Sequence, residues 1–203
     1  MPIELRNLKE FDERLNKRLL LIGALSGIVG PPLTLSMVII AVLLAPWFSW
    51  YNNALSDLGI SDVANLFNGA LILGGISGIL FSLGLREALK SKNCFTLGIT
   101  IFMMGSLSLI LVGIFTEFYG SLHFYFSASF FLLTPIGMII IGLSRIKILG
   151  FYGYYGIFAG IISLIIIFQV VIPVLKGAAI PEILSSLTIA SWIISLSTKI
   201  LKF

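Results

Sequence analysis

The chain has 203 residues, of which 58% are hydrophobic and only 11% charged, with a formal net charge of +4. A water-soluble domain of this length cannot bury so much apolar surface, so we expect lipid to be the solvent for much of the chain. The single cysteine, Cys94, excludes an intrachain disulfide and a multi-cysteine metal site.

Six apolar runs are long enough to cross a bilayer core, which takes about 20 helical residues. They cover residues 19–45, 64–85, 95–115, 122–143, 151–174 and 183–200. The first run is too long for the hydrophobic part of a signal peptide, so we expect it to be retained. Pro31 and Pro32 lie inside it and predict a kink or break. The sequence therefore predicts one all-α, polytopic membrane helix bundle over residues 1–203.

Basic residues fall almost entirely on one side of the membrane when the six spans alternate. That side holds Arg6, Lys9, Arg14, Lys17, Arg18, Arg86, Lys90, Lys92, Arg145, Lys147, Lys199 and Lys202. Only Lys176 lies on the other side. Since cytoplasmic loops collect Lys and Arg, we expect both termini in the cytoplasm of a multi-pass cell-membrane protein. The basic balance thus reflects orientation and gives no reason to expect nucleic acid as a partner.

Acidic residues gather on the opposite, outward side. Asp57 and Asp62 lie in the first connection, Glu117 in the third and Glu182 in the fifth, while His123 opens the fourth span. The first connection, WYNNALSDLGISD over residues 50–62, is the longest polar interruption in the first half of the chain.

A structural interpretation and a functional one compete for these polar residues. In the structural one, Ser56 or Asp57 caps a short helix, and Asn68 and His123 are hydrogen-bonding partners between helices, so that the protein is a non-catalytic scaffold. In the functional one, the outer ends of the second and fourth spans face each other and form an outward-facing polar pocket. Such a pocket would bind a lipid or partner molecule.

Catalysis is a further alternative, because ionisable groups near a membrane are costly and often functional. Asp57 could orient His123 as a general base, with Ser56 as nucleophile, although no nucleophile-elbow motif surrounds Ser56. A metal site built from His123 with carboxylates has too few histidines for zinc. Ion-coupled transport is disfavoured because the middle of the spans carries no acid or base.

The segment Asn53-Ala54-Leu55-Ser56-Asp57-Leu58-Gly59 and the following Leu66-Phe67-Asn68 and Gly74-Gly75 resemble the DUF-998 family of uncharacterised membrane proteins. His123 with Ser127, Phe130 and Phe131 is similar to a second element of that family. The first element is more distantly similar to the Frag1/DRAM/Sfk1 membrane proteins, which implies a lipid-related role by analogy. Ceramidase-like hydrolases differ, since they hold zinc with several histidines.

We therefore expect binding, or chemical modification, of a lipid or lipid-like headgroup, and turnover stays open. Candidate ligand-binding residues are Asn53, Ser56, Asp57, Gly59, Asn68, His123 and Ser127; catalytic candidates are Asp57, His123 and Ser56; secondary candidates are Asp62, Glu117 and Glu182. We expect no metal and no cofactor, and a membrane lipid as partner. Oligomerisation could use the small-residue faces Gly74/Gly78 or Gly156/Gly160. High isoleucine and a single glutamine are typical of a thermophilic prokaryote.

Overall fold

The computed structural model describes residues 3–89, 94–171 and 176–202, and every regular element in these ranges is helical. Six helices are long and apolar enough to cross a membrane. They are α1 (Ile3–Leu43), α2 (Ala64–Leu89), α3 (Cys94–Ile114), α4 (Ser121–Leu149), α5 (Phe151–Val171) and α6 (Ala179–Ile200). Two short 3₁₀ helices, η1 (Leu55–Ile60) and η2 (Glu117–Tyr119), lie in the first and third connections. The predicted all-α fold with six membrane helices is confirmed.

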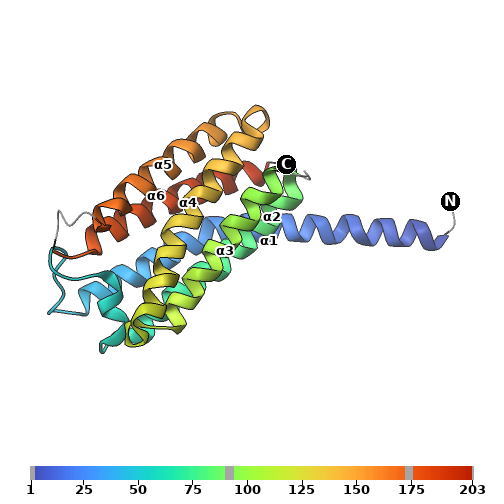
Figure 1. The fold of residues 1–203 in the computed structure, drawn as a ribbon. Helices are drawn as coiled ribbons and strands as arrows, with labels where there is room; N and C mark the ends of the chain where they lie inside the picture. The colour runs from blue at the N-terminus through green and yellow to red at the C-terminus, as the bar shows by residue number, and fades with distance from the viewer. Residues whose placement is uncertain (1–2, 90–93, 172–175, 203) are drawn as a thin grey trace.

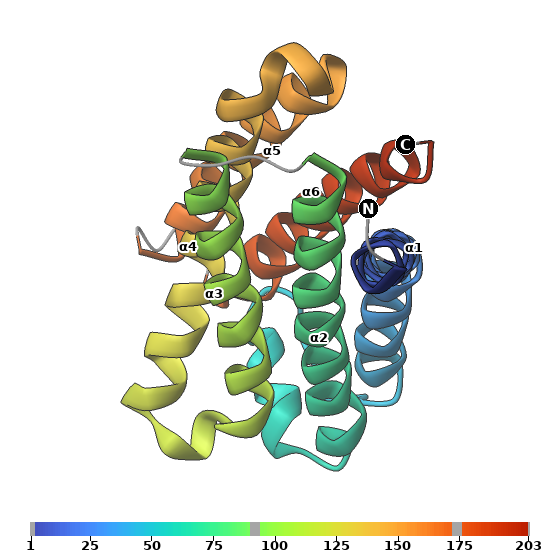
Figure 2. The same cartoon turned by 90° about the vertical axis from the view of Figure 1, so that its right-hand side faces the viewer.

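The helices form a ring in chain order. Each helix packs against the next, and α6 returns to pack against α1 (Figures 1 and 2). An aromatic cluster of Phe81, Phe102 and Trp192 lies in the interior, with ring centroids 5.8–5.9 Å apart. These rings come from α2, α3 and α6, so the cluster joins helices on different sides of the ring.

The first helix differs from the prediction in two ways. It begins at Ile3 instead of residue 19, because the charged N-terminal segment is rich in good helix formers such as leucine, lysine, glutamate and arginine. At about 1.5 Å per residue its 41 residues exceed the bilayer core, and its N-terminal part projects beyond the other helices (Figure 1). Of the kink or break predicted at Pro31 and Pro32, the break is absent, since α1 continues through both, and the kink stays a prediction.

The other boundaries move by a few residues. The helix predicted to end at residue 143 continues to Leu149, so Arg145 and Lys147 lie in α4 and not in a loop. The backbone of α4 is non-helical only at Arg145 (φ −129°, ψ 19°), whose guanidinium Nη2 donates to the Leu89 carbonyl at 3.1 Å. The last helix begins at Ala179 instead of residue 183, because Pro181 is tolerated in a first helical turn. Lys90, Lys92 and residues 172–174 of the predicted fifth span lie outside the described residues.

The two ends of the ring have opposite character. One end, called the acidic end here, is made by the connections after α1, α3 and α5 together with the helix starts that follow them. It carries Asp57, Asp62, Glu117 and Glu182. The other end, the basic end, holds Arg86, Arg145, Lys147 and Lys199 among the described residues, and the N-terminal part of α1 extends from it.

Both small-residue pairs lie at contacts within the chain. Gly74 faces Thr34 of α1, and Gly78 faces Ser106 of α3. Gly156 lies against Trp192 of α6, and Gly160 against α4. These faces therefore serve close packing of the bundle, and oligomerisation through them stays a prediction.

Candidate functional site

The three connections of the acidic end meet in space. The backbone amides of Gly177 and Ala179 donate to the carbonyls of Tyr51 and Asn53, at 2.9 and 3.0 Å. These two bonds join the start of α6 to the segment before η1. A hydroxyl–carboxylate contact from Ser56 of η1 to Glu117 of η2 joins the first connection to the third. Residues far apart in sequence thereby form one polar cluster.

Asp57 organises the start of η1. Its Oδ2 accepts hydrogen bonds from the Asn53 side-chain amide at 2.6 Å and from the Ala54 backbone amide at 3.2 Å. Asn53 in turn accepts from the Ser49 backbone amide at 2.9 Å. A side-chain acceptor at a helix start satisfies an amide that has no partner inside the helix, so the geometry of Asp57 is that of a cap.

Glu117 lies at the centre of the cluster. Its Oε1 accepts the Ser56 hydroxyl at 2.5 Å. Burial raises the pKa of the Glu117 carboxyl above its usual value, and the nearby charge of Asp57 raises this pKa further. The hydrogen bond from Ser56 and the nearby His123 both lower the pKa of Glu117. Glu117 is a secondary candidate in the sequence because it lies outside the two family-like elements, and its contact with Ser56, 61 positions away, is evident only in the structure.

Glu182 links the last helix to the first connection. From the first turn of α6 its Oε2 accepts the Leu55 backbone amide at 2.7 Å, although the two residues are 127 positions apart. The Glu182 carboxylate thus satisfies an amide at the start of η1. No local sequence pattern signals such a long-range cap.

His123 is buried at the start of α4. Its Nδ1 lies 2.7 Å from the Phe115 carbonyl oxygen. Since a carbonyl can only accept, Nδ1 carries the proton. Its Nε2 is 3.4 Å from the Ser127 hydroxyl. No hydrogen bond joins His123 to Asp57 in the described part of the chain, and both act electrostatically on Glu117, which lies near them.

Asn68, Gly59 and Asp62 are the other predicted candidates in the first connection and the second helix. The Asn68 side-chain amide donates to the Gly59 carbonyl at 2.9 Å, which ties η1 to α2. A Cβ at position 59 would lie 2.7 Å from the Asn68 Oδ1, so this contact requires glycine or a shift of the amide. Asp62 is exposed at the start of α2.

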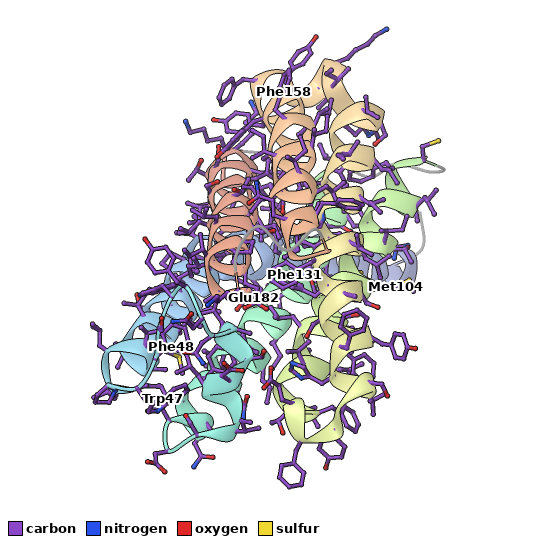
Figure 3. The ribbon with its side chains drawn as sticks, turned by 60° about the vertical axis from the view of Figure 1, so that its left-hand side comes forward. Trp47, Phe48, Met104, Phe131, Phe158 and Glu182 are labelled. Carbon is purple, nitrogen blue, oxygen red and sulfur yellow. The ribbon has the colours of Figure 1, made fainter. Side chains whose placement is uncertain are left out.

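A cavity of about 120 Å³, called the slot here, extends from this cluster into the bundle. Every membrane helix except α5 contributes to its walls. On α6 the lining residues run from Glu182 to Ile193, so the slot extends about 16 Å along that helix at about 1.5 Å per residue. Figure 3 labels Glu182 on α6 and Phe131 on α4, which both line the slot.

The walls of the slot are mainly apolar, and Glu182, the charged residue in its described lining, lies at one end. Ser56, Ser127 and Glu182 line it near the acidic end, whereas Phe67, Phe102 and Phe130 are among the aromatic wall residues. Of the predicted candidates, Ser56 and Ser127 line the slot, while Asn53, Asp57, Gly59, Asn68 and His123 lie outside its lining. Sequence reasoning missed the α6 wall, including Ser186, because only packing brings that face to the others.

Two residues of the slot lining have a buried hydroxyl without a hydrogen-bond partner among the described residues. They are Thr34 of α1 and Thr134 of α4. Thr134 is only 1% exposed. Both oxygens lie against a neighbouring helix, because a Cβ on Gly74 would be 2.9 Å from the Thr34 oxygen and a Cβ on Gly105 would clash with the Thr134 oxygen.

Metal ligation finds no support in the geometry. Within the described ranges no three or more His, Cys, Asp or Glu side chains form a group that could hold a metal ion. His123 uses Nδ1 for the Phe115 carbonyl, and Asp57 uses Oδ2 for the helix start.

Comparison with known families gives one match. The family described as "Protein of unknown function (DUF998)" matches residues 28–199, which include all residues of the cluster and the slot. No curated protein and no solved structure matches the chain. The more distant similarity to the Frag1/DRAM/Sfk1 proteins stays a prediction.

Proposed function

Because the chain belongs to the DUF998 family of unknown function, its role has to come from its geometry, and we propose that it binds a membrane amphiphile. One chain of a lipid or lipid-like molecule occupies the slot, and its headgroup lies at the acidic end. The slot itself carries this proposal, because its walls are mainly apolar and Glu182, the charged residue in its described lining, lies at the acidic end.

The dimensions of the slot favour a single chain. An apolar cavity of about 150 Å³ in another protein stays dry and binds benzene, so about 120 Å³ is enough for a slender apolar group. Spread over about 16 Å of helix, this volume is narrow. A single extended alkyl chain suits it, and the bulk of a two-chain lipid does not.

In this proposal some of the polar residues stabilise the fold and others contact the ligand. Asp57 and Asn53 hold the start of η1, and Asn68 holds Gly59. Ser56, Ser127 and Glu182 line the slot and contact the headgroup. Binding is preferred to hydrolysis because His123 and Asp57 each hydrogen-bond the backbone and not one another.

Tryptophan fluorescence provides the test. Trp192 packs against the slot-lining Phe102, with ring centroids 5.8 Å apart. With Trp47→Phe and Trp50→Phe, it is the last tryptophan. In phosphatidylcholine nanodiscs, dodecyl amphiphiles brominated at the chain end and carrying an ammonium, a maltoside or a phosphate headgroup are titrated. We expect saturable quenching of Trp192 by at least one of the three.

A matched pair of variants on α6 locates the binding. Ser186→Leu fills the slot and should weaken quenching about tenfold, in line with the usual cost of overpacking. Thr188→Leu adds similar bulk outside the slot and should quench like the parent. The proposal is overturned if no amphiphile quenches saturably, or if both variants quench alike while melting like the parent.

We further propose that the acidic end faces outward from the cell membrane and that both termini are cytoplasmic. The distribution of Lys and Arg supports this orientation. The headgroup would then come from the outer leaflet.

Cysteine labelling in intact cells tests the orientation. The exposed Cys94 lies at the basic end, where α3 begins. Asn52→Cys in a Cys94→Ser background places one thiol at the acidic end instead. A membrane-impermeant maleimide should label the Asn52→Cys protein in intact cells and label Cys94 only after lysis. The reverse pattern would invert the topology.

A further inference from the structure

The acidic end holds three carboxyl groups that no lysine or arginine among the described residues pairs with, although His123 lies near Glu117. Asp57, Glu117 and Glu182 accept hydrogen bonds from an amide side chain, backbone amides and a hydroxyl, and the Asp57 and Glu117 carboxyl groups also interact with each other. In the described part of the chain none of them forms an ion pair with Lys or Arg. Lys176 is the one basic residue described in the three connections, and it is exposed.

The three carboxylates act on one another. Asp57 and Glu117 lie near enough to Glu182 for their charges to affect it, and Asp57 likewise affects Glu117. Like charges in a partly buried site repel, and an opposite charge within about 4–6 Å relieves the repulsion. A cation at the mouth of the slot would supply that opposite charge.

The slot offers acceptors that are still free. Glu182 uses Oε2 for the Leu55 amide, and no described residue donates to its Oε1. The Ser56 hydroxyl donates a hydrogen bond to Glu117. The lone pairs of the Ser56 oxygen therefore remain available as acceptors at the slot. From these acceptors the slot continues between mainly apolar walls into the bundle, with a volume of about 120 Å³.

We infer that the headgroup is a cation that donates hydrogen bonds, a primary ammonium, held by Glu182 and Ser56 with Glu117 behind them. This inference rests on the proposed function and names its ligand class. An ammonium presents three donors to carboxylate and hydroxyl acceptors. A phosphate or carboxylate headgroup would be repelled by these acidic groups, and a neutral sugar would leave them without a counter-ion.

The three brominated dodecyl amphiphiles introduced above separate the headgroup classes. We expect the ammonium compound to quench Trp192 at concentrations about tenfold below the maltoside, and the phosphate to bind more weakly still. Glu182→Gln keeps an acceptor for the Leu55 amide but removes the charge. It should weaken the ammonium compound about tenfold and leave the maltoside unchanged.

Comparison of each variant with the parent removes differences in how the amphiphiles partition into the nanodisc. Asp62→Asn is the matched control, because it removes an exposed carboxylate at the same end outside the slot; it should bind like the parent. Glu117→Gln is the second variant, which should also weaken the ammonium compound selectively. Melting temperatures of all variants separate loss of binding from loss of fold.

Each outcome has a distinct meaning. Saturable quenching that is equal for all three headgroups overturns the cation inference and leaves chain binding standing. The same holds if Glu182→Gln weakens the ammonium and the maltoside equally while melting like the parent. Saturable quenching by none of the three overturns the proposed function itself.

Discussion

Trp192→Ala is expected to destabilise the bundle by about 3–5 kcal/mol, the usual result of removing a buried tryptophan side chain. Trp192 is fully buried, and its ring meets those of Phe81 and Phe102. Its Nε1 also donates to the Tyr152 carbonyl at 3.2 Å. Alanine would leave a cavity where α2, α3, α5 and α6 meet. Thermal unfolding in one detergent, followed by circular dichroism, measures the effect.

Two companion variants provide reference values for the loss of stability. Trp192→Phe keeps an aromatic ring but loses the bond to Tyr152, so a smaller loss is expected, with about 0.5–1.5 kcal/mol from the hydrogen bond. Phe158→Ala removes a ring that is 61% exposed on α5 and should stay within about 0.5 kcal/mol of the parent. If Trp192→Ala melts like Phe158→Ala, the aromatic cluster does not hold the bundle together.

Gly75→Ala is expected to destabilise the protein by about 1–3 kcal/mol, as overpacking generally does. A Cβ at this position would lie 2.5 Å from the Ser106 carbonyl oxygen and 3.0 Å from the Ile110 amide nitrogen. Both are backbone atoms of α3, so they cannot rotate away, and α2 and α3 would have to separate. The melting temperature should fall.

Gly69→Ala is the control on the same helix. A Cβ there has no atom within 4 Å. Since glycine inside a helix is about 0.5–1 kcal/mol less favourable than alanine, the variant should melt at or above the parent temperature. Equal shifts at positions 69 and 75 would contradict the close α2–α3 approach.

The hydropathy of the sequence was sufficient to predict the six membrane helices but not the residues at which they begin and end. The apolar runs placed all six spans because lipid demands apolar side chains over a fixed length. They could not show that α1 extends to Ile3 or that α4 continues past Arg145, since charged residues form helices readily outside the bilayer core. Pro31 and Pro32 do not break α1, because helices in membranes tolerate proline.

The site was only partly predictable, because it depends on contacts between residues that lie far apart in the sequence. Composition placed the polar residues at one end, and the resemblance gave weight to Ser56. The importance of Glu117 and Glu182 depends on partners 61 and 127 positions away, which no local pattern reveals. The slot depends on how helix faces pack together, and Ser186 and Thr134 become lining residues only in the assembled ring.

The bond from the Leu55 amide to Glu182 also sets an order of events during synthesis. A ribosome adds about 5–20 residues per second, so the 127 positions that separate the two residues correspond to roughly 6–25 s. Throughout that interval η1 lacks the carboxylate that completes its start, whereas α1 and α2 can already pack together. The mouth of the slot can therefore be completed only after the first turn of the sixth helix has been synthesised.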